Sequence, residues 1–279
     1  MKAGDHVVLA HHKPAATMWG RGGKAYDEVS FAISDALAHA AQRLNARAGE
    51  RILDVATGTG WSARNVARAG ALVTAVDISP ELLAAAADIS AQIRPPIEFQ
   101  LADVEQLQFE DGIFDGIIST FGVMFAINQA AAAAELGRVC RSGGRLILAT
   151  WAPGGAVAEF FGVIAKHSEA PPPPTSPLAW GDPSQVDKLL GNAFELNFEK
   201  GISNAYHSSV EDIWDWYTRG FGPLRQLVET LPPDRVERLK EDIDAYHRRY
   251  AVPAGLHVKR EYLLTIGRRR CKAEEPHVR

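Results

Sequence analysis

The chain has 279 residues, of which 46% are hydrophobic and 23% charged, so its composition excludes collagen, coiled coil and disorder as descriptions of the whole protein. The chain is long enough to bury one large hydrophobic core, so it needs no disulfide or metal ion for its stability. The 30 Lys and Arg residues against 34 Asp and Glu residues give a net charge of -4. No overall positive field therefore attracts nucleic acid, and we expect no nucleic-acid partner.

The cysteines and the apolar runs indicate a cytoplasmic location. Cys140 and Cys271 lie far apart without a C-x-x-C pattern, so we expect no disulfide framework and no zinc site. The four-residue apolar run from Val7 to Ala10 is too short for a signal peptide. No apolar stretch approaches the ~20 residues that cross a bilayer, so we expect no membrane insertion.

Helical and strand patterns alternate along the first half of the chain. Helical spacing of apolar residues predicts a helix over 31–48 that stops at Gly49, further helices over 62–69, from Ser79-Pro80 onward and over 128–140, and a helical stretch over about 209–250. Short apolar runs predict strands at 51–56, 71–77, 97–103, 114–120, 145–150, 194–201 and 261–267. The alternation predicts an α/β fold with a doubly wound, mostly parallel, seven-stranded sheet. We expect a single domain, 1–279, with a helical cap over about 205–256 inserted before the last strand.

A glycine-containing loop, Asp54 to Trp61, follows the first predicted strand. This is the carboxyl end of the strand, where open α/β sheets bind their ligands. Glycine permits sharp turns and a close approach of the backbone to a ligand. Asp77 ends the next strand about 20 residues later, where a carboxylate can accept hydrogen bonds from ribose hydroxyls. Both features predict a cofactor that contains adenosine.

Two cofactor classes compete for this loop. Gly58 to Ala63 satisfies G-x-G-x-x-G/A, so an NAD(P)-dependent oxidoreductase is one alternative. A pyrophosphate, however, needs donors, and the loop follows Asp54 with no Lys or Arg before Arg64. S-adenosylmethionine (SAM) carries a sulfonium and an ammonium instead, which match the charges of Asp54, Asp77 and Asp103. We therefore favour SAM.

The sequence resembles class I SAM-dependent methyltransferases, and within them the ubiquinone and menaquinone C-methyltransferase group. The resemblance rests on ordered motifs: ILDVATGTG (52–60), VDIS (76–79), LADVEQLQF (101–109), FDGIISTFGVMF (114–125) and ELGRVCRSGGRLILATW (135–151). It covers roughly residues 45–151, which it identifies as the SAM-binding core of a Rossmann-like fold. Two positions depart from the family pattern: Ala56 replaces the first loop glycine, and Met124-Phe125 replaces a common Leu-His, so no histidine is available there.

The resemblance implies a set of cofactor contacts. Asp54 and the loop backbone would hold the methionine part, Asp77 with Ile78 the ribose and adenine, and Asp103 with Val104 the adenine edge. Ser119 would lie beside the methyl donor. The implied cofactor-binding residues are Asp54, Ala56, Thr57, Gly58, Thr59, Gly60, Trp61, Asp77, Ile78, Asp103, Val104 and Ser119.

Aromatic residues are the candidates for substrate binding. Trp19 and Tyr26 resemble part of an N-terminal lid over residues 1–30, although helix packing explains them equally well. Met124, Phe125 and Trp151 follow the carboxyl ends of the fourth and fifth strands, where a substrate is expected, with core packing as the alternative. The cap aromatics Trp214, Trp216, Tyr217 and Phe221 fit interior packing better than a pocket.

Methyl transfer is an in-line displacement that needs alignment and exclusion of water, so neither a metal nor a general base is required. His11, His12, His167 and His207 lie in the predicted flexible or cap regions, and we assign none of them as a base. We expect a methyltransferase for a small, partly apolar acceptor. A SAM-binding protein without turnover remains the alternative from another class, and the sequence leaves open whether the chain forms a homodimer.

Overall fold

The computed structural model describes residues 8–271. In this part of the chain one sheet has the strand order β3-β2-β1-β4-β5-β8-β6, and the two-residue strand β7 pairs with β8. The strands are β1 (Arg51–Val55), β2 (Leu72–Asp77), β3 (Glu98–Leu101), β4 (Phe114–Thr120), β5 (Cys140–Trp151), β6 (Phe194–His207), β7 (Ala251–Val252) and β8 (Gly255–Arg269). The seven-stranded, mostly parallel α/β sheet predicted from the sequence is confirmed, with β7 as a short addition.

The parallel centre of the sheet is buried on both faces. β1 pairs in parallel with β2 on one side and with β4 on the other. Ile52 and Leu53 on β1, like Ile117 and Ile118 on β4, have no exposed surface. Continuous apolar runs of this kind are typical of strands covered by helices on both faces, which is why the sequence pattern located them well.

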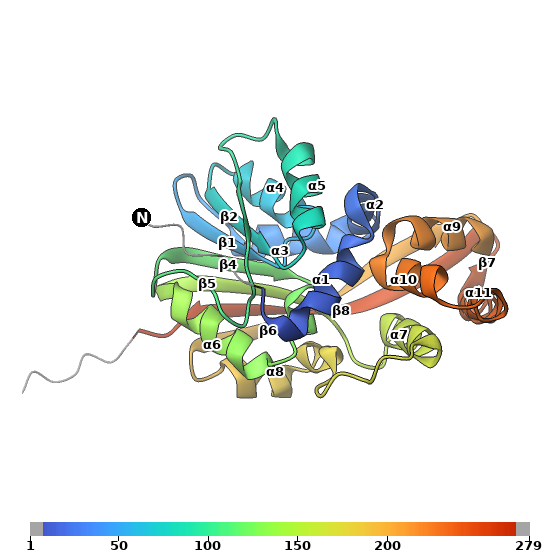
Figure 1. Cartoon of the computed structure of the whole chain (residues 1–279). Coiled ribbons are helices and arrows are strands. Elements are labelled where there is room, and N and C mark those ends of the chain that lie inside the picture. Colours follow the sequence, from blue (N-terminus) through green and yellow to red (C-terminus); the bar gives the residue numbers. More distant parts are fainter. Residues whose placement is uncertain (1–7, 272–279) are drawn as a thin grey trace, which may run out of the picture.

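Helices cover both faces of this sheet. Figure 1 shows α4 (Trp61–Ala67) and α5 (Pro80–Ser90) beside β2 in the upper part of the view, and α6 (Gln129–Val139) and α8 (Pro183–Leu190) below β5. α3 (Ser34–Leu44) packs against β4 and β5. Side chains fix two of the helix starts: Ser79 accepts the N–H of Leu82, and Asn128 accepts the N–H of Ala131. The layers hold the carboxyl ends of β1, β2 and β4 in one place.

The predicted helix over residues 31–48 is present as α3, but it is shorter than predicted, because the helical conformation is interrupted at Ala32 and Ile33. α2 (Tyr26–Phe31) ends before the break, and α3 ends at the left-handed residue Asn45 rather than at Gly49. Arg260 of β8 donates a hydrogen bond to the carbonyl of Ala32, which the break leaves free. A tertiary contact thus overrides the local helical pattern.

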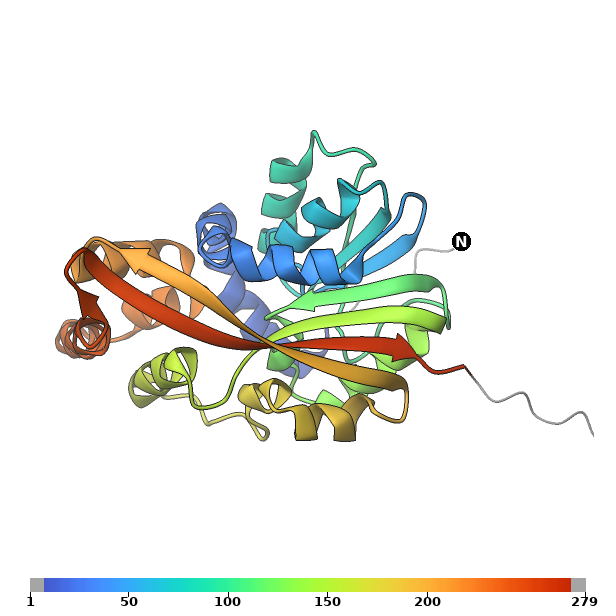
Figure 2. The ribbon, with the colours of Figure 1, turned by 180° about the vertical axis from the view of Figure 1, so that it is seen from behind.

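The last two strands form a ribbon longer than predicted. β6 and β8 pair antiparallel from Phe194 opposite Arg269 to His207 opposite Leu256, whereas the sequence suggested strands over 194–201 and 261–267 only. Figure 2 shows this ribbon projecting beyond the parallel strands and ending beside the cap helices. The cap consists of three helices, α9 (Val210–Gly220), α10 (Gly222–Thr230) and α11 (Pro233–Arg248), which are separated at Phe221 and at Leu231-Pro232.

The N-terminal segment lies across the carboxyl ends of the strands. It contains η1 (Ala10–His12), α1 (Lys13–Gly20), η2 (Gly23–Ala25) and α2, and α1 packs against both α5 and α10 (Figure 1). The expected lid over 1–30 includes residues 1–7, which lie outside the described residues. The remaining helical elements are η3 (Val123–Phe125), α7 (Ala156–His167) and η4 (Pro177–Gly181). Within residues 8–271, no helix is both long and apolar enough to cross a membrane.

Candidate active site

A cavity of about 970 Å³ lies between the carboxyl ends of β1, β2 and β4 and the N-terminal segment. The order of strands reverses between β1 and β4, which is where open α/β sheets bind ligands. Eight of the expected cofactor-binding residues line the cavity: Ala56, Thr57, Gly58, Trp61, Asp77, Ile78, Asp103 and Val104. Three of the expected substrate-binding residues also line it: Trp19, Tyr26 and Phe125.

Asp77 fixes the glycine loop on one side of the cavity. Its Oδ2 accepts the N–H of Gly58 at 2.9 Å, and its Oδ1 accepts the N–H of Ser79 at 2.9 Å. Burial raises the pKa of the Asp77 carboxyl, and the backbone donors oppose that rise. Gly58 has φ +56°, and a Cβ there would come within 3.2 Å of the Tyr26 ring. The Tyr26 ring therefore lies directly over the loop.

Asp54 lies beneath the loop rather than on the cavity wall. It has no exposed surface, and its Oδ2 accepts the hydroxyl of Thr57 at 2.6 Å. Burial raises the pKa of Asp54 to about 7, and the bond from Thr57 opposes this. Because Thr57 lines the cavity, Asp54 influences the cavity indirectly, through its hydrogen bond with Thr57 and through the charge of its own carboxylate.

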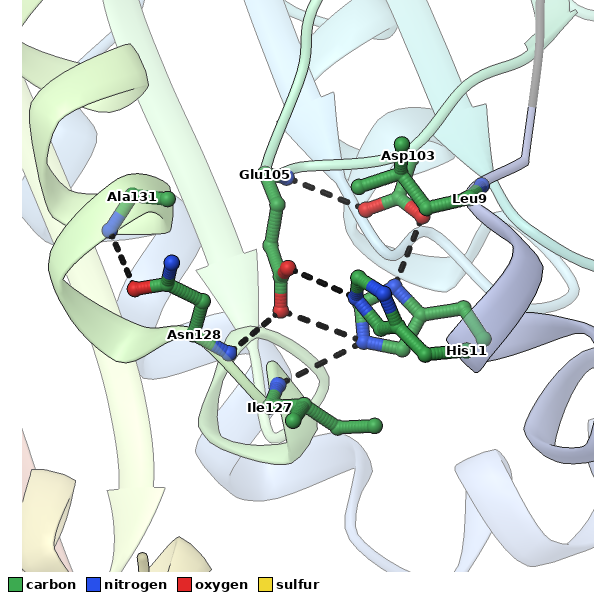
Figure 3. Close-up of polar contacts among 8 residues, drawn as sticks. Leu9, His11, Asp103, Glu105, Ile127, Asn128 and Ala131 are labelled. Atoms are coloured by element: carbon green, nitrogen blue, oxygen red, sulfur yellow. Dashed lines mark hydrogen bonds and ion pairs between the residues drawn. The ribbon is translucent and has the colours of Figure 1, made fainter. Parts of the chain in front are cut away.

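Asp103 holds the N-terminal segment at another side of the cavity. Its Oδ2 lies 2.7 Å from Nδ1 of His12 and accepts the N–H of Leu9 at 3.1 Å (Figure 3). Burial disfavours the Asp103 carboxylate, yet the His12 bond and the backbone donors hold its pKa below the ordinary value. The pKa of His12 changes in the opposite direction. Burial lowers it, but the bond with Asp103 and the charges of Asp103 and Glu105 outweigh burial, so the pKa of His12 lies above its ordinary value. His12 was expected in a flexible region, but it is buried and lines the cavity.

Aromatic rings line another part of the wall. The Trp19 ring lies 5.1 Å from Phe125 and 6.0 Å from Tyr26, measured between ring centroids. Phe121 follows β4 with φ +60°, a strained conformation for a bulky residue of the kind found at functional sites. The sequence analysis missed Phe121, although its position directly after the fourth strand was a usable signal.

Six expected contact residues do not line the cavity, and each has a structural explanation. Asp54 and Thr59 are fully buried, and Gly60 turns the chain into α4 with φ +83°. Ser119 donates to the carbonyl of Val55 and accepts the N–H of Val123, so its hydroxyl ties β4 to β1. Met124 is fully buried in the core, and Trp151 stacks on Phe121 with ring centroids 3.8 Å apart.

Gly122 is a second residue that the sequence analysis missed. It lines the cavity, and a Cβ there would lie 2.4 Å from the Cβ of Ala56. Ala56 itself has φ +53°. The two residues allow the loops after β1 and β4 to approach each other closely, which a larger side chain at position 122 would prevent.

The charge of the cavity wall fits a cationic ligand. Among residues 8–271, those that line it include two carboxylates, Asp77 and Asp103, and no Lys or Arg; His12 also lines it and is bonded to Asp103. A pyrophosphate would require positive or N–H donors in their place, so the wall does not fit a dinucleotide. The sulfonium and ammonium of SAM match it.

Comparison with known proteins agrees with this geometry. Residues 53–148 match the methyltransferase domain family. A demethylmenaquinone methyltransferase of Tropheryma whipplei is 31% identical over 220 residues, which cover 76% of this chain and 82% of that protein. An uncharacterized protein of Mycobacterium tuberculosis is 32% identical over 224 residues, covering 78% and 80%.

The solved structure of the YcgJ protein from Bacillus subtilis shares the fold, with a TM-score of 0.61 at 19% identity over 85% of this chain and 99% of that one. Identity above 30% over about four fifths of a relative, together with this fold and the ordered motifs, establishes the family. The chain belongs to the class I SAM-dependent methyltransferases.

Proposed function

We propose that this protein transfers the methyl group of SAM to a small, partly apolar acceptor. The observation that carries the proposal is the division of one cavity into two kinds of wall. Carboxylates and a glycine loop, around Asp77 and Asp103, line one part, and the aromatic rings of Trp19, Phe121 and Phe125 line another. The first part suits the charged cofactor and the second an apolar acceptor.

When bound, SAM would supply a methyl group on its sulfonium. The acceptor atom would attack the methyl carbon in line, and S-adenosylhomocysteine would leave. Asp77 would accept hydrogen bonds from the ribose, and Asp103 and Val104 would contact the adenine. The backbone of Ala56 to Gly58 would hold the methionine part. These residues orient the reactants and exclude water, which is the main requirement of an in-line displacement.

Among the described residues, 8–271, none on the cavity wall is a free base. His12 is the histidine that lines the cavity, and its Nδ1 is engaged by Asp103. Burial and the charge of Asp77 raise the pKa of Tyr26, so its phenol stays protonated at neutral pH and can only donate or accept a hydrogen bond. An acceptor with its own activated atom, such as an enolised carbon or an acidic phenol, is therefore favoured.

Calorimetric titration of the purified chain with SAM, S-adenosylhomocysteine and NADH tests the cofactor. Transfer of label from methyl-labelled SAM to a panel of phenols, quinols, amines and thiols tests the acceptor. Binding of the first two ligands together with label in an aromatic acceptor would support the proposal. Binding of NADH alone would refute it, and binding of SAM with no transfer to any acceptor class would favour a binding protein without turnover.

A further inference from the structure

Within residues 8–271, three side chains of metal-ligating type meet beside the cavity. One ligand atom from each of His11, His12 and Glu105 lies within 4.8 Å of the other two. Nε2 of His11 is 2.8 Å from Oε2 of Glu105, and Nε2 of His12 is 3.2 Å from Oε1 (Figure 3). Two ligand atoms on one tetrahedral Zn²⁺ ion, each about 2.1 Å from it, lie roughly 3.4 Å apart, so the two distances from the histidines to Glu105 are close to those that one ion requires.

The hydrogen bonds of His12 show which of its nitrogens faces Glu105. Nδ1 faces Oδ2 of Asp103 at 2.7 Å, and since a carboxylate only accepts, Nδ1 carries a proton. Nε2 lies 3.4 Å from the backbone nitrogen of Ile127 and also faces Glu105. Nε2 can therefore face the Glu105 carboxylate either with a proton on it or with a cation between the two groups. A histidine whose other nitrogen donates to a carboxylate is also the usual arrangement of a metal ligand.

Burial and charge strengthen this argument. The Asp103 side chain is 0% exposed and that of Glu105 is 2% exposed, so two carboxylates are desolvated side by side. A divalent cation would offset both negative charges, whereas a protonated His12 alone would offset one. The His11 side chain is 46% exposed, so one side of the cluster is open to solvent for the entry of an ion and for a water ligand.

We propose that His11, His12 and Glu105 bind a divalent transition-metal ion such as Zn²⁺, with Asp103 orienting His12. Imidazole and carboxylate ligands suit this class of ion, and three protein ligands leave a position for water. The ion would be structural rather than catalytic. It would join residues 11 and 12 to the loop after β3 and so fix the N-terminal segment against the cavity wall, a consequence that rests on the proposed function.

The test uses the untagged full chain, stripped with a chelator and titrated with Co²⁺ and Zn²⁺. We expect one ion per chain and the visible absorption of tetrahedral Co²⁺ in the wild-type protein. Because loss of an outer-shell partner alone weakens metal binding 10–100-fold, His11→Gln and Glu105→Gln should weaken it on the order of 100-fold or more. His167→Gln is the matched control, since His167 also pairs with a carboxylate, Asp242 at 3.0 Å, but lies on α7.

The exposed position of His11 keeps the test informative, because His11→Gln should leave the fold intact even if Glu105→Gln does not. Absence of a bound ion, or equal affinity in wild-type protein and His11→Gln, would overturn the proposal and leave a His12–Asp103 ion pair alone. S-adenosylhomocysteine binding, measured on the metal-free and metal-loaded chain, separates the two proposals. Normal cofactor binding without an ion refutes only the metal site, whereas an ion without cofactor binding refutes only the proposed function.

Discussion

Replacing Asp77 by Asn tests the cofactor site most directly. The carboxylate accepts one backbone N–H on each oxygen, from Gly58 and from Ser79, and still lines the cavity. An Asn side chain keeps one acceptor, and its NH₂ group must then face one of these N–H donors. Hydrogen bonds to a charged group contribute ~1.5–3 kcal/mol each. Loss of one such bond to the ribose should therefore weaken cofactor binding roughly 10- to 100-fold.

The assay is calorimetric titration with S-adenosylhomocysteine, with thermal unfolding measured on the same samples. Asp115→Asn is the matched control, because Asp115 also accepts a backbone N–H, from Arg51 at 2.8 Å, but lies at the start of β4, away from the cavity. Both variants should lose some stability, and only Asp77→Asn should lose affinity. A folded Asp77→Asn protein that binds the cofactor with wild-type affinity would refute this assignment of Asp77.

Three further outcomes are expected. Gly58→Val should abolish S-adenosylhomocysteine binding in calorimetry and cost ~1–2 kcal/mol of stability for a left-handed residue, and unchanged binding would contradict the loop assignment. Trp19→Ala should raise the KM for the acceptor more than that for SAM in steady-state kinetics, because Trp19 lies against Phe125 on the aromatic wall; equal effects would argue for a purely structural Trp19. His247 is 2% exposed, and burial lowers its pKa from 6.5 to about 4. The unfolded chain therefore binds a proton there that the folded chain does not, and acidification from pH 7 to 4 should cost about 3 kcal/mol in denaturant unfolding. His247→Gln should remove that dependence, and identical pH profiles would contradict the assignment.

The parallel half of the fold was predictable because its signal is local. A strand covered by helices on both faces must be apolar throughout, so β1 and β4 appear in the sequence as short runs within a residue of their actual bounds. The glycine loop was predictable for the same reason, since a ligand that approaches the backbone closely requires residues without a large side chain there. Asp77 and Gly58 meet as expected because the loop and the second strand end side by side.

Other features depend on contacts that no local pattern contains. The break at Ala32 is stabilised by Arg260, 228 residues later in the chain. The contact of His12 with Asp103 spans 91 residues, and without it His12 resembles any polar residue near an N-terminus. The extension of β6 and β8 carries polar residues such as Ser203, whose hydroxyl donates to Asp35, so no apolar alternation marked it as a strand.

The same distinction explains why the motifs predict the cofactor and not the acceptor. The cofactor part of the cavity is built from the loops after β1, β2 and β3, where the motifs lie. The aromatic part depends on Trp19, whose ring contacts Phe125 on one side and Phe221 of the cap on the other, at 5.1 Å and 5.6 Å between centroids. Under the proposed function, the N-terminal segment, which the cap contacts through Phe221, would set the size of the acceptor space. Since both lie outside residues 45–151, relatives that share the motifs can bind SAM alike and still select different acceptors.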